Sequence, residues 1–293
     1  MLWILLTAAA APLQVARNAL QRGLVGDAGP WGATLVRFLF GLPFSIAIFA
    51  VVAAATPDAA PSASPRFWMA IAAGAFGQVI QTALLLLAMR RSGFAVATFM
   101  QQTNLPLSAL FGWAVFADAM SPGAWAGLLA ATVGLCILSW PKGGFRSGAL
   151  IGSALGIASG AAMAVVLNAY RQAGLALEPA HPIYAGTAAV CVAQALQSAG
   201  LTLVLALTRP AALKAVTAAW RQSLGAGFCG AAASACWFSA LALAPAGQVR
   251  AVGVIELPIA AAAGRRLFKE RLSLRQAVGG LATGIGVVTT ALG

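Results

Sequence analysis

One acidic side chain of this sequence lies deep inside an apolar stretch, where a charge needs a specific reason. The chain has six acidic residues, and five of them lie in or beside predicted loops, whereas Glu256 lies eight residues into a predicted helix. At a rise of about 1.5 Å per residue, its depth is about 12 Å, near the middle of a bilayer. Pro258 follows, and because proline has no N–H, it leaves the carbonyl of residue 254 without its helical hydrogen bond. A carboxylate beside a weakened helix predicts a site for a cation, a proton or a substrate amine. The alternative is a structural ion pair with Arg250 or Arg37.

Amide side chains recur at helical spacing in other apolar stretches. Asn104 follows Gln101 by three residues, so both lie on one helix face. Similar pairs are Gln78 with Gln81, Gln14 with Asn18, and Gln194 with Gln197. A buried amide in lipid must find a hydrogen-bond partner, so such pairs either line a cavity that binds a zwitterion or tie helices together. Trp237 forms an apolar cavity wall or packs in the interior. The candidate substrate-binding residues are therefore Gln101, Asn104, Glu256, Gln78, Gln81, Gln14, Asn18 and Trp237.

Arg37 lies six residues into its predicted helix, about 9 Å deep. Its guanidinium could meet a substrate carboxylate, or it could extend along the helix to the membrane interface. Of these two, extension to the interface is the favoured interpretation.

The sequence contains little that metal, cofactor or enzyme chemistry requires. The only histidine is His181, in a predicted loop, and no two carboxylates share an apolar stretch. The four cysteines lie in apolar stretches without a C-x-x-C pair, so we expect them to be packing residues. No phosphate-binding P-loop is present. We therefore expect no metal site, no cofactor and no catalytic residue, and a membrane-embedded enzyme is the least favoured function.

Composition places the chain in a membrane. Apolar residues make up 61% of it and charged residues only 8%, whereas a soluble domain has about 25% charged residues. The net charge of +12 comes from basic residues in short loops, without a nucleic-acid-binding module, so we expect no nucleic-acid partner. Ten apolar stretches are each long enough to span a bilayer as a helix. They cover residues 2–21, 31–55, 67–89, 94–117, 122–140, 148–170, 182–207, 223–243, 248–268 and 274–292.

An internal repeat divides these ten predicted helices into two sets of five. Residues 105–134 match residues 257–286 at a constant shift of 152, with ten identities among thirty pairs. Because five is an odd number, the second half must enter the membrane from the opposite side. We therefore predict an all-α membrane protein with two inverted five-helix repeats, residues 1–146 and 147–293, around a central cavity. The same shift maps Asn104 onto Glu256, so these two side chains should face each other near the centre.

Basic residues indicate how the helices are oriented. Loops after odd-numbered helices, with the adjoining helix ends, carry fourteen Lys and Arg residues, whereas the other face carries three. The positive-inside rule then places the odd loops in the cytoplasm and both termini outside.

The paired motifs resemble the EamA-like branch of the drug/metabolite transporter superfamily. In each half, a helix with Leu-Pro leads to an acid at its end and then to G-x6-G: Leu105-Pro106, Asp118, Gly127 and Gly134, and then Leu257-Pro258, Glu270, Gly279 and Gly286. Residues Leu35-Val36-Arg37-Phe38 are also similar to that family. Two features depart from it. The family often has Trp-Gly in the first helix, where this chain has Ala11-Pro12, and it commonly places both termini in the cytoplasm.

The resemblance implies a secondary active transporter that exports amino acids or related small metabolites by alternating access in the bacterial cytoplasmic (inner) membrane. Its partners would be a small-molecule substrate and the lipid bilayer, without an ATPase subunit, and a monomer is compatible with the sequence. One embedded carboxylate among neutral amides favours an amine-bearing solute over a polyanion. Other cargo on the same fold, such as a vitamin, a quaternary amine or drug, or a nucleotide sugar, remains an alternative.

Overall fold

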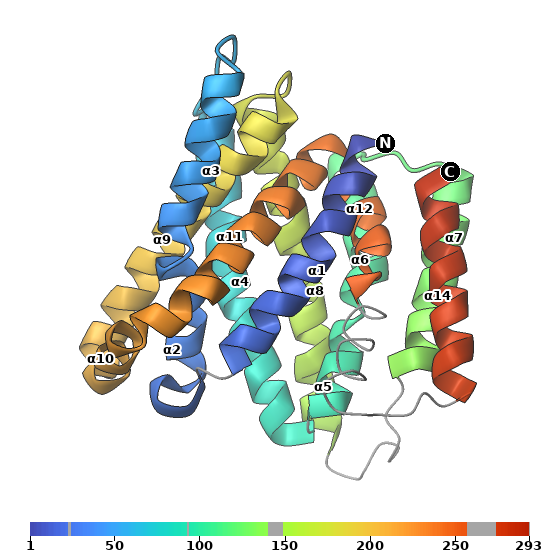
Figure 1. Ribbon diagram of the computed structural model, residues 1–293. Helices are drawn as coiled ribbons and strands as arrows, with labels where there is room; N and C mark the ends of the chain where they lie inside the picture. Colours follow the sequence, from blue (N-terminus) through green and yellow to red (C-terminus); the bar gives the residue numbers. More distant parts are fainter. Residues whose placement is uncertain (23–24, 93, 140–148, 257–273, 293) are drawn as a thin grey trace. The chain divides into compact units, whose positions relative to one another are not determined.

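The computed structural model describes residues 1–22, 25–92, 94–139, 149–256 and 274–292, and the regular structure within these ranges is entirely helical (Figure 1). The helices are α1 (Leu2–Arg22), α2 (Val25–Leu39), α3 (Leu42–Ala55), α4 (Pro65–Ser92), α5 (Phe94–Gln101), α6 (Asn104–Phe116), α7 (Pro122–Ser139), α8 (Ala149–Leu177), α9 (Pro182–Thr208), α10 (Pro210–Ala218), α11 (Trp220–Leu243), α12 (Ala246–Gly253) and α14 (Leu274–Leu292). The predicted all-α class is confirmed.

Five helical spans in the described ranges are long and apolar enough to cross a bilayer. They are Thr34–Ala55, Pro65–Met89, Leu150–Leu177, Pro182–Thr208 and Trp220–Leu243, and shorter apolar helices accompany them. Large apolar side chains point outward along these spans, as in Leu150, which is 83% exposed, and Leu207, which is 77% exposed. Such a surface is stable against lipid rather than water. The chain is therefore a multi-pass membrane protein.

Each of the ten predicted stretches contains a described helix, but some boundaries differ from the prediction. Helix α8 continues to Leu177, so most of the loop expected at 172–181 is helical. The stretch 208–222, between two predicted membrane segments, contains the separate helix α10, which contacts α2 and α9.

Three of the predicted helices are interrupted shortly before a proline. Helix α2 ends at Leu39 and α3 begins at Leu42, just before Pro43. Helices α5 and α6 are separated by a turn at residues 102–103, before Pro106, and α12 gives way to a turn at residues 254–255. Proline lacks the N–H that would bond to the carbonyl four residues earlier, and its ring crowds that carbonyl. These prolines therefore account for the breaks, although Pro258 itself lies outside the described residues.

Two of these breaks occur at equivalent positions of the internal repeat. Gln102 N–H donates to the Phe99 carbonyl at 3.0 Å and Thr103 N–H to the Met100 carbonyl at 3.2 Å. At a shift of 152, Val254 N–H donates to the Ala251 carbonyl at 3.3 Å and Ile255 N–H to the Val252 carbonyl at 3.1 Å. Each bond reaches back three residues, as in a tight 3₁₀-like turn. The two halves thus break their helices in the same way and at the same point.

The chain forms two compact units. Unit 1 contains Met1–Ala75 and Tyr170–Leu243, and unit 2 contains Phe76–Ala169 and Ala244–Gly293. Helices α4 and α8 each contribute to both units. Since each unit draws on both halves of the sequence, the division into repeats 1–146 and 147–293 concerns sequence equivalence rather than packing, and it stays a prediction.

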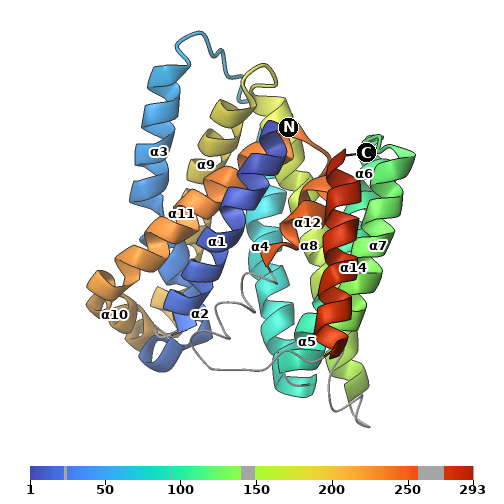
Figure 2. The ribbon, with the colours of Figure 1, turned by 45° about the vertical axis from the view of Figure 1, so that its right-hand side comes forward.

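In unit 1, α1 lies along α11 in the antiparallel direction (Figure 2). As the residue number rises along α1, the number of the contacted residue on α11 falls: Gln14 contacts Trp237, Arg17 contacts Gly230 and Leu20 contacts Gly225. At one end of the unit, the segment between α3 and α4 binds the segment between α8 and α9. Ser62 N–H donates to the Leu177 carbonyl at 2.8 Å, and Ala60 N–H donates to the Glu178 carboxylate at 2.9 Å.

In unit 2, predicted segments that are equivalent in the repeat run antiparallel to each other. Helix α7 packs against α14, where an added methyl at Gly134 would overlap the backbone of Thr283 and one at Gly286 would overlap that of Ala131. The shift of 152 turns the first of these contacts into the second, so the contact is reciprocal. Helix α6 packs antiparallel to α12 in the same unit, through Ala109 against Gly247.

Candidate functional site

The centre of the candidate site is one arginine that joins a carboxylate to an amide. Arg250 Nη1 lies 3.1 Å from Glu256 Oε1, and Arg250 Nε donates to Asn104 Oδ1 at 2.8 Å. Asn104 is almost fully buried, at 2% exposed, whereas the side chains of Arg250 and Glu256 are 11% and 14% exposed. The charged pair is thus largely enclosed by protein, with a small part of each side chain exposed.

The helix breaks explain why these groups meet. Asn104 is the first residue of α6, directly after the turn at residues 102–103, and Glu256 directly follows the turn at residues 254–255. Arg250 lies on α12, one turn before its end, and α12 contacts α6. Two equivalent breaks on neighbouring antiparallel helices therefore bring Asn104 and Glu256 close together, joined through Arg250. Of the two ion-pair partners suggested for Glu256 from the sequence, Arg250 is the one observed.

Hydrogen bonds extend this cluster through three more helices of unit 2. Asn104 Nδ2 donates to the Gln101 carbonyl at 2.7 Å, and Gln101 Nε2 lies 3.5 Å from Ser159 Oγ on α8. The Ser159 hydroxyl also accepts a bond of 3.1 Å from Gln81 Nε2 and donates one of 3.0 Å to the Gln81 carbonyl on α4. Buried and partly buried polar side chains from α4, α5, α6, α8 and α12 thus form a continuous network.

Five of the eight predicted site residues belong to unit 2, namely Gln78, Gln81, Gln101, Asn104 and Glu256. Four of them lie in this network, and Gln78 is on α4, three residues before Gln81. The other three, Gln14, Asn18 and Trp237, belong to unit 1. Gln14 Oε1 accepts a hydrogen bond of 3.1 Å from Trp237 Nε1, whereas the side chain of Asn18 lies outside the described residues. The assignment of all eight to substrate binding stays a prediction.

Two residues of the network, Arg250 and Ser159, are not among the site residues predicted from the sequence. Arg250 has a signal of its own, because it is a charge near the start of the apolar stretch that contains Glu256, but that signal indicates only a structural partner. Ser159 has none, since it lies in a stretch of Gly, Ala and Ser residues typical of close helix packing. In unit 1, Gln194 and Gln197 tie helices together: Gln194 accepts from Ser45, and Gln197 donates to the Ala75 carbonyl and to the Tyr170 hydroxyl.

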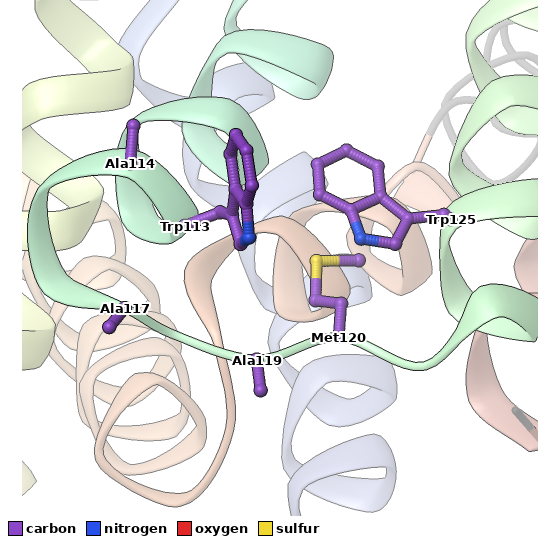
Figure 3. Close-up of a pocket in the computed structure, with 6 residues that line it drawn as sticks. All are labelled: Trp113, Ala114, Ala117, Ala119, Met120 and Trp125. Atoms are coloured by element: carbon purple, nitrogen blue, oxygen red, sulfur yellow. The ribbon is translucent and has the colours of Figure 1, made fainter.

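A separate pocket of about 560 Å³ in unit 2 has an apolar lining (Figure 3). Trp113, Met120 and Trp125 lie close together in the lining, and Ala114, Ala117 and Ala119 complete it. It lies at the end of α6 and the start of α7, and nine residues of α6, about 13 Å, separate Trp113 from Asn104. Tryptophans at helix ends are typical of the membrane interface, so the pocket is not part of the polar network. Within the described ranges, no group of His, Cys, Asp and Glu residues could hold a metal ion.

Comparisons with known proteins agree with this architecture. A solved structure described only as "Crystal structure of protein" superimposes with a TM-score of 0.69 at 19% sequence identity, covering 99% of this chain and 96% of that chain. At this identity, the likeness establishes the fold alone. No curated protein matches the chain. Residues 1–140 match the model of the EamA-like transporter family, which confirms the resemblance seen in the sequence. That match covers just under half of the chain.

Proposed function

We propose that the protein is a secondary active transporter that exports amino acids or related small metabolites across a bacterial cytoplasmic membrane. Its central binding site is the network of Arg250, Glu256, Asn104, Gln101 and Gln81. The observation that carries the proposal is the ion pair of Arg250 and Glu256 beside two helix breaks. Broken helices expose backbone groups only where these are buried in protein or line a cavity, which suits a transport site near the bilayer midplane.

The charges of this pair suit a zwitterionic solute. A guanidinium and a carboxylate 3.1 Å apart can separate to receive a substrate carboxylate and a substrate ammonium group. The exchange replaces one buried ion pair by two, so neither protein charge is left alone in a medium of low dielectric. The neutral amides of Gln101 and Asn104 then serve the remaining polar groups of the solute.

The direction of the helices supports two inverted five-helix repeats around a central cavity. The equivalent helices α7 and α14 run antiparallel, and α6 and α12, which belong to the equivalent predicted segments 94–117 and 248–268, also run antiparallel. A parallel repeat would make each pair run in the same direction. Alternating access would then follow from rocking of one repeat against the other around the polar site.

A transport assay with matched variants tests the proposal. The purified chain in proteoliposomes is given a panel of radiolabelled amino acids, with and without a pH gradient. We expect Glu256→Gln to slow transport of the accepted substrate at least tenfold, since a charge-assisted hydrogen bond contributes about 1.5–3 kcal/mol. Asp58→Asn, which changes an exposed loop acid, serves as the control. Unchanged transport by Glu256→Gln at every pH would remove this carboxylate from the mechanism.

The double variant Arg250→Gln/Glu256→Gln separates binding from folding. Removing both charges leaves no unpaired buried ion, so the double variant should fold as well as the parent chain. If the pair binds substrate, transport stays low in this well-folded protein. If the pair is only structural, transport recovers along with stability.

A further inference from the structure

Unit 1 contains two arginines that lie side by side, one buried and one partly buried. Arg17 of α1 is only 7% exposed. Both Arg17 and Arg37 of α2 pass over Gly230 of α11: a methyl on Gly230 would lie 3.3 Å from Arg17 Cδ and 3.4 Å from Arg37 Cγ. The aliphatic parts of both arginine side chains therefore pack against Gly230.

Arg37 is held by contacts within unit 1. Its guanidinium carbon lies 5.0 Å from the centre of the Phe38 ring, which gives a cation–π contact. Its Nε is buried and has no hydrogen-bond partner among the described residues. A buried guanidinium donor without an acceptor is costly, because it has lost its hydration without replacement.

The described carboxylates of unit 1 are engaged elsewhere. Asp58 lies 3.2 Å from His181. Glu178 accepts hydrogen bonds from Ala60 N–H at 2.9 Å and from Ala180 N–H at 3.2 Å. The side chain of Asp27 lies outside the described residues.

The neighbouring helix adds further unmatched polar groups. Helix α9 contacts α2, and on α9 the Gln194 Nε2 and Ser198 Oγ atoms are buried without a partner in the described part of the chain. Gln194 and Ser198 are four residues apart, on one face of α9. Amide and guanidinium N–H groups only donate, and a hydroxyl can donate as well as accept, so this set is rich in donors. A ligand that matches it must carry acceptor oxygens and negative charge.

We propose that Arg37, with Arg17 beside it, forms an anion-binding site in unit 1 that takes a carboxylate or phosphate group. The planar guanidinium fork suits either group, because both present two oxygens at the matching spacing. The group belongs to a small soluble anion or to the headgroup of an anionic lipid. This site is separate from the network of Arg250 and Glu256, and it does not depend on the transport function proposed above.

Thermal unfolding of the full chain in nanodiscs tests the site. In phosphatidylcholine nanodiscs, the Tm is measured in chloride, acetate and phosphate at equal ionic strength, and then with phosphatidylglycerol in the bilayer. A rise in Tm with acetate or phosphate identifies a soluble anion, and a rise only with phosphatidylglycerol identifies a lipid headgroup. In either case, Arg37→Met should abolish the rise, and Arg221→Gln, a change at an exposed arginine, should retain it. No rise in the parent chain, or an equal rise in Arg37→Met, would overturn the proposal.

A second pair of variants applies if Arg37→Met does not fold. Gly230→Ala keeps both charges but pushes a methyl against both arginines, so the response to the anion should weaken at least severalfold. Gly200→Ala, on α9 of the same unit, adds a methyl with nothing within 4 Å and should leave the response unchanged. Equal responses in these two variants would contradict the proposal.

Discussion

At the scale of single residues, Arg250 decides how the polar network of unit 2 is connected. Its Nε and Nη1 reach an amide on one helix and a carboxylate beyond the end of its own helix. Asn104 is correspondingly occupied at both ends of its amide, since Oδ1 accepts from Arg250 and Nδ2 donates to the Gln101 carbonyl. A buried amide with both ends satisfied fixes the orientation of the arginine next to it.

Because both ends of the Asn104 amide are bonded, its replacement should cost more stability than replacement of Gln102, two residues earlier. Asn104→Leu removes the acceptor of Arg250 Nε, so we expect a loss of about 1–3 kcal/mol of stability. Gln102→Met, by contrast, removes a buried Oε1 that has no partner among the described residues, and it should be neutral or stabilising. Unfolding by SDS in mixed micelles measures both free energies. Equal losses would mean that Arg250 finds another acceptor.

Part of this network can be predicted from the sequence. The shift of 152 maps Asn104 onto Glu256, and the proximity of the two residues follows from that equivalence. The sequence does not indicate which atoms bond, because helical periodicity specifies the face of a helix but not the reach of a long side chain such as Arg250. The bond between Gln14 and Trp237 escapes prediction for the same reason, since it joins residues 223 positions apart.

At the scale of helices, proline and glycine decide where the chain breaks and where it packs closely. The sequence predicts a weakened helix near Pro258, whereas the apolar pattern of residues 31–55 and 94–117 predicts one continuous helix in each, without the breaks observed before Pro43 and Pro106. Pro12 lies inside α1 without ending it, so a proline alone does not specify a break. A glycine alone likewise does not specify close packing, since only a glycine that faces another backbone must lack a side chain.

Two neighbouring glycines of α14 offer a direct test of this difference. Gly286 is buried, and a methyl there would overlap the Ala131 backbone of α7, so Gly286→Ala should destabilise the protein by about 1–3 kcal/mol. Gly284 is exposed, with nothing within 4 Å of an added methyl. Gly284→Ala should gain up to about 1 kcal/mol from helix propensity. Thermal unfolding in detergent compares the two, and a stable Gly286→Ala protein would argue against close packing of α7 and α14.

At the scale of the whole molecule, helix direction within each unit agrees with a chain that crosses the membrane at every predicted segment. Successive segments must run in opposite directions. An odd-numbered and an even-numbered segment are therefore antiparallel, whereas two odd-numbered or two even-numbered segments are parallel. In unit 2, α4 and α8 are antiparallel through Gly77 with Val166 and Gln81 with Ser159. Contacts of α5 and α6 with α8 instead run parallel: Met100 meets Gly156, Thr103 meets Gly160 and Ser108 meets Asn168. Composition alone could predict the number of segments, but only these contacts report their directions.

The orientation of the chain in the membrane gives the last prediction. Ser62 and Ala119 lie between segments two and three and between segments four and five, so ten alternating spans place both on one face of the membrane, and Thr217, in α10, on the other. The fourteen basic residues near the odd-numbered loops then place Ser62 and Ala119 outside and Thr217 in the cytoplasm.

The four native cysteines are free and are first replaced by alanine, after which each of these exposed positions receives a single cysteine. In intact bacterial cells, a membrane-impermeant maleimide should label Ser62→Cys and Ala119→Cys, and it should label Thr217→Cys only after permeabilisation. The reverse pattern would keep ten alternating spans but refute the orientation drawn from charge, in favour of the cytoplasmic termini that the family resemblance implies. Labelling of Ser62→Cys and Ala119→Cys from different sides would refute the alternation itself, because an even number of crossings between these positions requires them to share a face.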